Sequence, residues 1–181
     1  MREGRARAPW SRNVNVNQLL ADLFDALQPL AEERAVRLVP DFEGVAILDW
    51  GVPPDLVYAF ENLMENGIKY SEHGGEVTVR LRVQDDRVTV TVEDRGIGIP
   101  DDFLEEVLLE FVRAPNAKKH APEGTGLGLA IAREAVEGHG GTLVLASREG
   151  GGTTATITLP VHVRPANGTH EASVGSGRDM A

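Results

Sequence analysis

Two asparagines, a lysine and a tyrosine near the middle of the chain have the spacing of one helix face. When each residue turns by about 100°, these residues fall within an arc of about 100°; they are Asn62, Asn66, Lys69 and Tyr70. Two carboxamide oxygens one turn apart can hold a hard cation such as Mg²⁺, and a nearby lysine can then meet phosphate. The alternative is an exposed face that happens to carry two asparagines. Asn is a poor helix former in interior positions, which favours the functional interpretation.

A second group of residues follows a predicted strand and joins an aspartate to two glycines. Asp94, Gly96 and Gly98 alternate with Arg95 and Ile97. Glycines at this spacing let the backbone approach a flat ligand, while the carboxylate accepts a hydrogen bond from it, for example from an exocyclic amine. The alternative is an ordinary turn at the end of a strand, because Asp and Gly are common turn residues.

A third group places alternating glycines directly before an apolar helix. Its residues are Gly124, Thr125, Gly126, Leu127 and Gly128. Free backbone amides at a helix N-terminus attract phosphate, and a triphosphate fits this arrangement. The spacing is neither that of a P-loop nor that of the dinucleotide fingerprint, since the glycines follow an irregular segment instead of a strand. The alternative is a flexible hinge.

The elements that must position these groups follow from hydrophobic periodicity. Spacings of three and four residues predict helices over about residues 15–34, 54–71 and 127–137. Alternation predicts two hairpins, 76–83 with 87–93 and 142–147 with 153–159, and a third in which 36–39 pairs with 45–48. Residues 101–111 are expected to form a short helix. His139 is expected at the end of the last helix, as a partner of its dipole.

Length and composition indicate one soluble globular domain. The chain has 181 residues, 25% charged and 41% hydrophobic, and a net charge of −10, which disfavours nucleic acid and anionic membranes as partners. It has no cysteine and no apolar run long enough for a membrane span, which fits a reducing, cytoplasmic setting without membrane contact. We expect a flexible lead-in over residues 1–13, a domain over 14–163 and a disordered tail over 164–181.

The order of the three groups resembles the ATP-binding domain shared by sensor histidine kinases, gyrase-type topoisomerases, heat-shock chaperones and mismatch-repair ATPases. Residues 62–71 are similar to the N box of the sensor histidine kinases, residues 94–98 to their G1 box, Phe111 to their F box and residues 124–128 to their G2 box. The resemblance implies a two-layer α+β sandwich. In this fold three main helices lie on one face of a mixed, mainly antiparallel sheet, and ATP and Mg²⁺ bind between the helices and a lid, about residues 112–126.

The resemblance also implies a role for each matching residue. Asn66 would bind Mg²⁺ with support from Asn62, Lys69 would meet phosphate, and Tyr70 would lie along the nucleotide. Asp94 would recognise adenine in a pocket shaped by Gly96 and Gly98. Gly124, Thr125, Gly126, Leu127 and Gly128 would wrap the phosphates. Lys118 and Lys119 in the lid would reach the γ-phosphate, unless they are simply solvated lid charges.

The N box also favours transfer to a protein over hydrolysis. The relatives that hydrolyse ATP carry a general-base glutamate one turn before the metal-binding asparagine, where this chain has Asn62, and a carboxamide cannot take a proton from water. Glu61 and Glu65 lie to one side of the asparagine face and are expected to be solvated.

The sequence lacks a recognisable phosphoacceptor. None of its five histidines precedes a segment like that of a kinase phosphoacceptor helix. We therefore expect the catalytic portion of a two-component sensor histidine kinase, which would donate the γ-phosphoryl of Mg-ATP to a histidine on a domain outside this sequence and act indirectly on a response regulator. The alternatives are a stand-alone anti-sigma-type serine kinase and a nucleotide-switched binding module.

Overall fold

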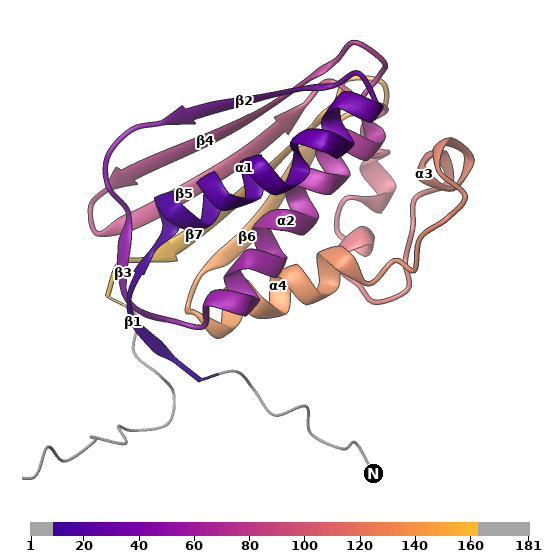
Figure 1. The fold of residues 1–181 in the computed structure, drawn as a ribbon. Helices are drawn as coiled ribbons and strands as arrows, with labels where there is room; N and C mark the ends of the chain where they lie inside the picture. The colour runs from indigo at the N-terminus through magenta and orange to yellow at the C-terminus, as the bar shows by residue number, and fades with distance from the viewer. Residues whose placement is uncertain (1–8, 163–181) are drawn as a thin grey trace, which may run out of the picture.

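A computed structural model describes residues 9–162, which form two layers (Figure 1). One layer is a five-stranded sheet in the order β2-β4-β5-β7-β6, and helices α1, α2 and α4 cover one of its faces. The expected sandwich of three main helices on one face of the sheet is confirmed. The helices are α1 (Val16–Glu33), α2 (Pro53–Tyr70) and α4 (Gly128–Gly138), and a short α3 (Pro115–His120) lies apart from the sheet.

The sheet is mixed and mainly antiparallel, as predicted. β4 (Glu76–Gln84) and β5 (Arg87–Asp94) form the first expected hairpin, and β6 (Thr142–Ser147) and β7 (Thr153–Pro160) form the second. β5 and β7 pair antiparallel at the centre of the sheet, whereas β2 (Arg37–Phe42) runs parallel to β4. Alternate residues of β4, β5 and β7 are buried under the helices, so each strand has one apolar face.

The third expected hairpin is wrong. β2 pairs with β4, and β3 (Ile47–Gly51) pairs instead with β1 (Ser11–Asn15) in a separate two-stranded ribbon. The reason lies in the connection between β2 and β3. Asn17 of α1 donates to the carbonyl of Gly44 and accepts from the amide of Ala46, at 3.1 and 2.8 Å, and so draws this connection onto α1 instead of letting it form a tight turn.

The predicted boundary of the lead-in at residue 13 is also wrong, because β1 begins at Ser11. Pairing with β3 supplies backbone partners for this segment, and short-range sequence patterns do not reveal such partners. Residues 1–8 and the expected tail over 164–181 lie outside the described residues. The short helix expected over 101–111 is instead two single turns of 3₁₀ helix, η1 (Asp101–Phe103) and η2 (Glu106–Leu108).

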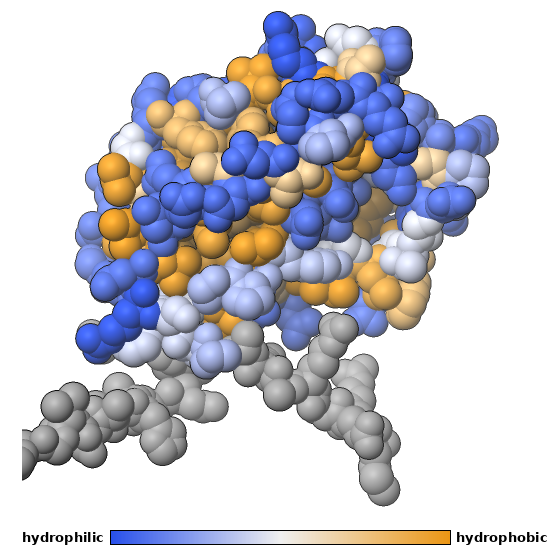
Figure 2. Space-filling model, in the orientation of Figure 1, coloured by the Kyte–Doolittle hydropathy of each residue, from blue (hydrophilic) through white to orange (hydrophobic). Residues whose placement is uncertain are grey.

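The core lies between the helices and the sheet. α2 buries the apolar side predicted for it, including Phe60, Met64 and Ile68, and this leaves its polar side on a cleft. Gly67 lets α2 approach the sheet closely, because a Cβ there would lie 3.0 Å from a methyl group of Val77. Figure 2 shows mainly hydrophilic side chains on the outer helix surfaces, with smaller apolar patches between them.

None of the helices within residues 9–162 combines the length and the apolar character that a bilayer crossing requires.

Candidate functional site

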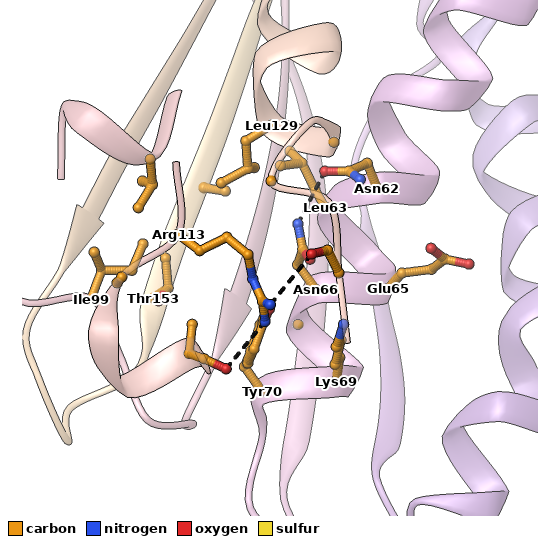
Figure 3. Close-up of a pocket in the computed structure, with 18 of the residues that line it drawn as sticks. Asn62, Leu63, Glu65, Asn66, Lys69, Tyr70, Ile99, Arg113, Leu129 and Thr153 are labelled. Atoms are coloured by element: carbon orange, nitrogen blue, oxygen red, sulfur yellow. Dashed lines mark hydrogen bonds between the residues drawn. The ribbon is translucent and has the colours of Figure 1, made fainter. Parts of the chain in front are cut away.

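One cleft of about 300 Å³ brings the three groups of residues together, between α2, the loop after β5, the lid and the start of α4 (Figure 3). Asn66, Asp94 and Gly126, which lie far apart in the sequence, all line it. The predicted site residues on its wall are Asn62, Asn66, Lys69, Tyr70, Asp94, Gly98, Gly124, Thr125, Gly126 and Gly128. Gly96, Lys118, Lys119 and Leu127 are not on the wall.

The two asparagines contact each other on the polar side of α2. Asn66 Nδ2 donates to Asn62 Oδ1 at 3.0 Å, which turns both carboxamides toward one another (Figure 3). Within the described residues, Asn66 Oδ1 accepts no hydrogen bond. The start of α4 presses on this pair, since a Cβ on Gly128 would lie only 2.0 Å from Asn62 Nδ2. A side chain at residue 128 would therefore displace the carboxamide of Asn62.

Asp94 lies at the end of β5 with one carboxylate oxygen fixed by the backbone. Its Oδ1 accepts from the amides of Gly96 and Thr153, at 2.8 and 3.2 Å. In the described part of the chain, Oδ2 accepts no hydrogen bond. Burial raises the pKa of Asp94 to about 6, against the opposing effect of the two backbone hydrogen bonds. A buried carboxylate with one fixed oxygen and one oxygen without a hydrogen bond can recognise a hydrogen-bond donor such as an exocyclic amine.

The glycines after Asp94 fit the loop against neighbouring backbone. A Cβ on Gly96 would lie 2.0 Å from the carbonyl oxygen of Tyr70, and the amide of Ile97 donates to that same oxygen at 3.1 Å. Gly98 has a φ of +64°, and a Cβ there would collide with the carbonyl of Arg148. Gly96 therefore acts from behind the cleft wall, by seating the loop on the end of α2.

The lid differs from the irregular segment predicted for it. Its residues 115–120 form helix α3, and Lys118 and Lys119 are exposed on that helix, away from the cleft wall. The structure does not bring these two lysines to the cleft. Asn116 of α3 ties the lid to the G1-like loop by donating to the carbonyl of Gly98 at 2.8 Å.

Arg113 is a charged cleft residue that the sequence patterns did not single out. Its guanidinium lies among carbonyl groups of the lid, and it donates to Pro122 at 2.8 Å, to Ala117 at 3.3 Å and also to Ala121. The carbonyl of Gly124 is a fourth acceptor for the guanidinium of Arg113, at 3.4 Å. The only sequence signal was a basic residue two positions after Phe111, at the start of the lid.

Lys69 also pairs with the lid. Its Nζ donates to the carbonyl of Glu123 at 3.0 Å and lies 5.5 Å from the ring centroid of Tyr70. His120 of α3 contacts the same end of α2, with its Nε2 3.2 Å from the carbonyl of Lys69. Both cations on the cleft wall, Lys69 and Arg113, are thus held by backbone oxygens of the lid.

The two neighbouring glutamates are poorly placed for proton transfer in the cleft. Glu65 lines the cleft, but it is mostly exposed, and in Figure 3 its carboxylate points away from Asn66. Partial burial, together with the nearby Glu61, raises the pKa of Glu65 above its usual value. Glu61 does not line the cleft.

Comparison with known proteins agrees with this geometry. Residues 51–163 match the family model described as histidine kinase-, DNA gyrase B-, and HSP90-like ATPase. The sensor histidine kinase WalK of Bacillus subtilis (strain 168) is 37% identical over 153 residues, which are 83% of this chain and 24% of WalK. The sensor-like histidine kinase SenX3 of Mycolicibacterium smegmatis is 33% identical over 171 residues, which are 93% of this chain and 44% of SenX3. The chain thus spans less than half the length of these relatives.

Solved structures show the same likeness. A mycobacterial sensor histidine kinase, MprB, superposes with a TM-score of 0.69 at 26% identity, over 84% of this chain and 99% of that one. The catalytic domain of the histidine kinase ThkA superposes with a TM-score of 0.73 over 85% of this chain and 99% of that one. At 20% identity, the ThkA comparison shows a common fold alone.

Proposed function

Because the chain belongs to the family of histidine kinase-, DNA gyrase B- and HSP90-like ATPases, we propose that its cleft holds Mg-ATP as the catalytic part of a sensor histidine kinase. The observation that carries this proposal is the convergence of Asn66, Asp94 and Gly126 on one cleft. In the proposed arrangement, Oδ2 of Asp94 accepts a hydrogen bond from the exocyclic amine of adenine. Tyr70 lies along the nucleotide.

The phosphates are proposed to lie between α2 and the start of α4. Amides of residues 124–128 face them at the N-terminus of an 11-residue helix, where the helix dipole favours negative charge. Lys69 and Arg113 supply the positive charge, after exchanging the lid carbonyls that they now contact for phosphate oxygens. Lys118 and Lys119 have no part in this arrangement.

The asparagine pair fits Mg²⁺. Asn66 Oδ1 makes no hydrogen bond among the described residues, and amide oxygen is a ligand that Mg²⁺ accepts together with water and phosphate. No group of three or more His, Cys, Asp or Glu side chains within residues 9–162 could hold a metal ion. Asn66 would therefore hold the ion with phosphate oxygens, and Asn62 would orient Asn66. The ion would neutralise charge on the transferred phosphoryl group.

The proposed acceptor is a histidine from outside the cleft. Asn62 occupies the position from which a general base would activate water, and its carboxamide cannot take a proton. None of the four histidines among the described residues lines the cleft. We therefore assign phosphoryl transfer to a phosphoacceptor domain, with a response regulator as the indirect partner and a cytoplasmic location. A stand-alone serine kinase is less well supported, since the relatives are sensor histidine kinases.

A transfer assay tests this proposal. The chain is mixed with radiolabelled ATP, Mg²⁺ and a separately made phosphoacceptor fragment from a sensor kinase, and the label on the fragment is followed over time. We expect acid-labile, base-stable labelling that depends on Mg²⁺ and is lost in Asp94→Ala. ATP binding without any labelled fragment, across several phosphoacceptor fragments, would refute the kinase assignment and favour a nucleotide-switched binding module.

A further inference from the structure

His139 is buried at a junction of three elements on the side of the domain away from the lid. It follows the last residue of α4, and only 2% of its surface is exposed. Its Nε2 accepts from the amide of Val52 at 2.9 Å, and its Nδ1 lies 2.6 Å from the carbonyl of Ala135. Because the Val52 amide is the donor at Nε2, Nδ1 is the ring nitrogen that donates to the carbonyl of Ala135. The bond to Ala135 caps the end of α4, where His139 was expected.

The same imidazole joins the end of α4 to the start of α2, and these two helices frame the cleft. Val52 is the N-cap of α2, the helix that carries Asn62 and Asn66, and His139 is the C-cap of α4, whose first residue is Gly128. One hydrogen bond of a buried side chain therefore fixes the end of α4 to the beginning of α2.

The ribbon of β1 and β3 closes over this junction. The ring centroid of Trp10 lies 5.1 Å from that of His139, within the range of aromatic pairs. β1 then pairs with β3 through Ser11 and Gly51, and a Cβ on Gly51 would come within 3.6 Å of His139 Nε2. Trp10, which directly precedes β1, thus packs on His139.

The other end of α4 packs closely against α2. A Cβ on Gly128 would lie 2.0 Å from Asn62 Nδ2, so even a small displacement of the helix start changes the position of Asn62. α4 is a three-turn helix of 11 residues, about 16 Å long, and it packs along α2. A shift at His139 therefore reaches the asparagine pair, since Asn66 donates to Asn62.

We propose that His139 is a positioning residue for the phosphate end of the cleft, and that Trp10 makes this positioning respond to the entering chain. The imidazole sets where α4 lies along α2, and hence the placement of Asn62 and Asn66. Displacement of Trp10 from the ring of His139 loosens the bond between His139 and Val52 and so weakens nucleotide binding. The inference about nucleotide binding rests on the proposed function. The inference about Asn62 rests on the contacts alone.

Two variants of the full chain test the proposal. His139→Phe keeps a ring at this position but removes both hydrogen bonds of His139. Trp10→Leu removes only the aromatic ring that packs on His139. We expect a weaker Kd for Mg-ATP by calorimetry, about three- to tenfold for His139→Phe and about twofold for Trp10→Leu. In nitrogen-15 NMR spectra without nucleotide, both variants should shift the side-chain amide resonances of Asn62.

Matched controls separate positioning from general destabilisation. His73→Phe changes an exposed histidine, and Trp50→Leu changes the tryptophan that contacts Arg12 instead of His139; neither should move the Asn62 resonances. Folded variants that lose thermal stability but keep the wild-type Kd and Asn62 resonances would show a merely structural role and overturn the proposal.

Two further outcomes remain informative. If His139→Phe does not fold, Trp10→Leu decides, and unchanged Asn62 resonances in it overturn the proposal. If the wild-type chain does not bind Mg-ATP, the proposed function fails, whereas the Asn62 resonances still test the link from Trp10 through His139.

Discussion

Replacing Asp94 by Asn should stabilise the domain while it removes nucleotide binding. Burial raises the pKa of Asp94 from 3.8 to about 6. At about 1.36 kcal/mol for each pKa unit, keeping this carboxyl ionised at pH 7 costs the folded state about 3 kcal/mol. The side-chain oxygen of Asn can still accept from the amides of Gly96 and Thr153, and it carries no charge. We therefore expect Asp94→Asn to raise the free energy of unfolding at pH 7 by about 2 to 3 kcal/mol.

The sign of this effect fixes its pH dependence. The pKa of Asp94 is higher in the folded state than in the unfolded state, so ionisation lowers stability. The penalty is absent below pH 3.8, grows between pH 3.8 and about 6, and is constant above that. Binding follows the opposite course, because ionisation leaves Oδ2 as an unprotonated acceptor for the amine, while Oδ1 stays with the amides of Gly96 and Thr153. Wild-type affinity for Mg-ATP should fall about tenfold between pH 7 and pH 5.

Urea unfolding and calorimetry at several pH values between 5 and 7.5 measure both quantities. The ratio of wild-type to Asp94→Asn affinity isolates the contribution of Asp94 from the titration of the nucleotide itself. Asp102→Asn, at an exposed aspartate outside the cleft, is the matched control and should leave stability and binding unchanged. An Asp94→Asn protein that is less stable than the wild type at pH 7, or that binds Mg-ATP equally well, would refute the reasoning.

Three further predictions concern the rest of the cleft. Asn66→Ala should weaken Mg-ATP binding by about 1 to 3 kcal/mol, and calorimetry with and without Mg²⁺ should show that its affinity no longer depends on the metal. Gly128→Ala places a Cβ 2.0 Å from a side-chain atom of α2 and should destabilise the domain by about 1 to 3 kcal/mol in urea unfolding, whereas Gly138→Ala, with nothing within 4 Å, should be neutral or stabilising. Arg113→Ala removes four donor contacts to lid carbonyls and should raise hydrogen exchange across residues 114–124 without changing exchange in the sheet.

Features encoded by local periodicity were predictable. The polar side of α2 follows from the spacing of Asn62, Asn66 and Lys69, because neighbouring turns of one helix decide which side chains lie together. The two antiparallel hairpins were equally accessible, since each is joined by a short turn and alternates apolar with polar residues. Alternation along residues 87–93 also predicts Asp94 at a strand end, whereas its contact with Thr153 depends on the long-range pairing of β5 with β7.

Features that depend on pairing between distant segments were not predictable. β1 pairs with β3 across more than 30 residues, and the parallel pairing of β2 with β4 requires α2 as its crossover. The role of Arg113 is hidden for a related reason. A guanidinium surrounded by four backbone carbonyls leaves no pattern of side chains, and only the folded path of the lid creates the site.

The partners of the cleft cations determine what nucleotide binding involves. Lys69 holds the carbonyl of Glu123, and Arg113 holds the carbonyls of Pro122 and its neighbours, so neither cation meets a phosphate without giving up a lid contact. Binding is then an exchange of neutral hydrogen bonds for charge-assisted ones, and its driving force is the difference between the two. The carbonyl of Glu123 belongs to the lid, so its release by Lys69 removes one contact between the lid and α2, while the contact of His120 with the carbonyl of Lys69 stays. Under the proposed function, nucleotide binding is therefore coupled to the loss of this contact, and the chain would present a different lid surface to its partner with ATP than without it.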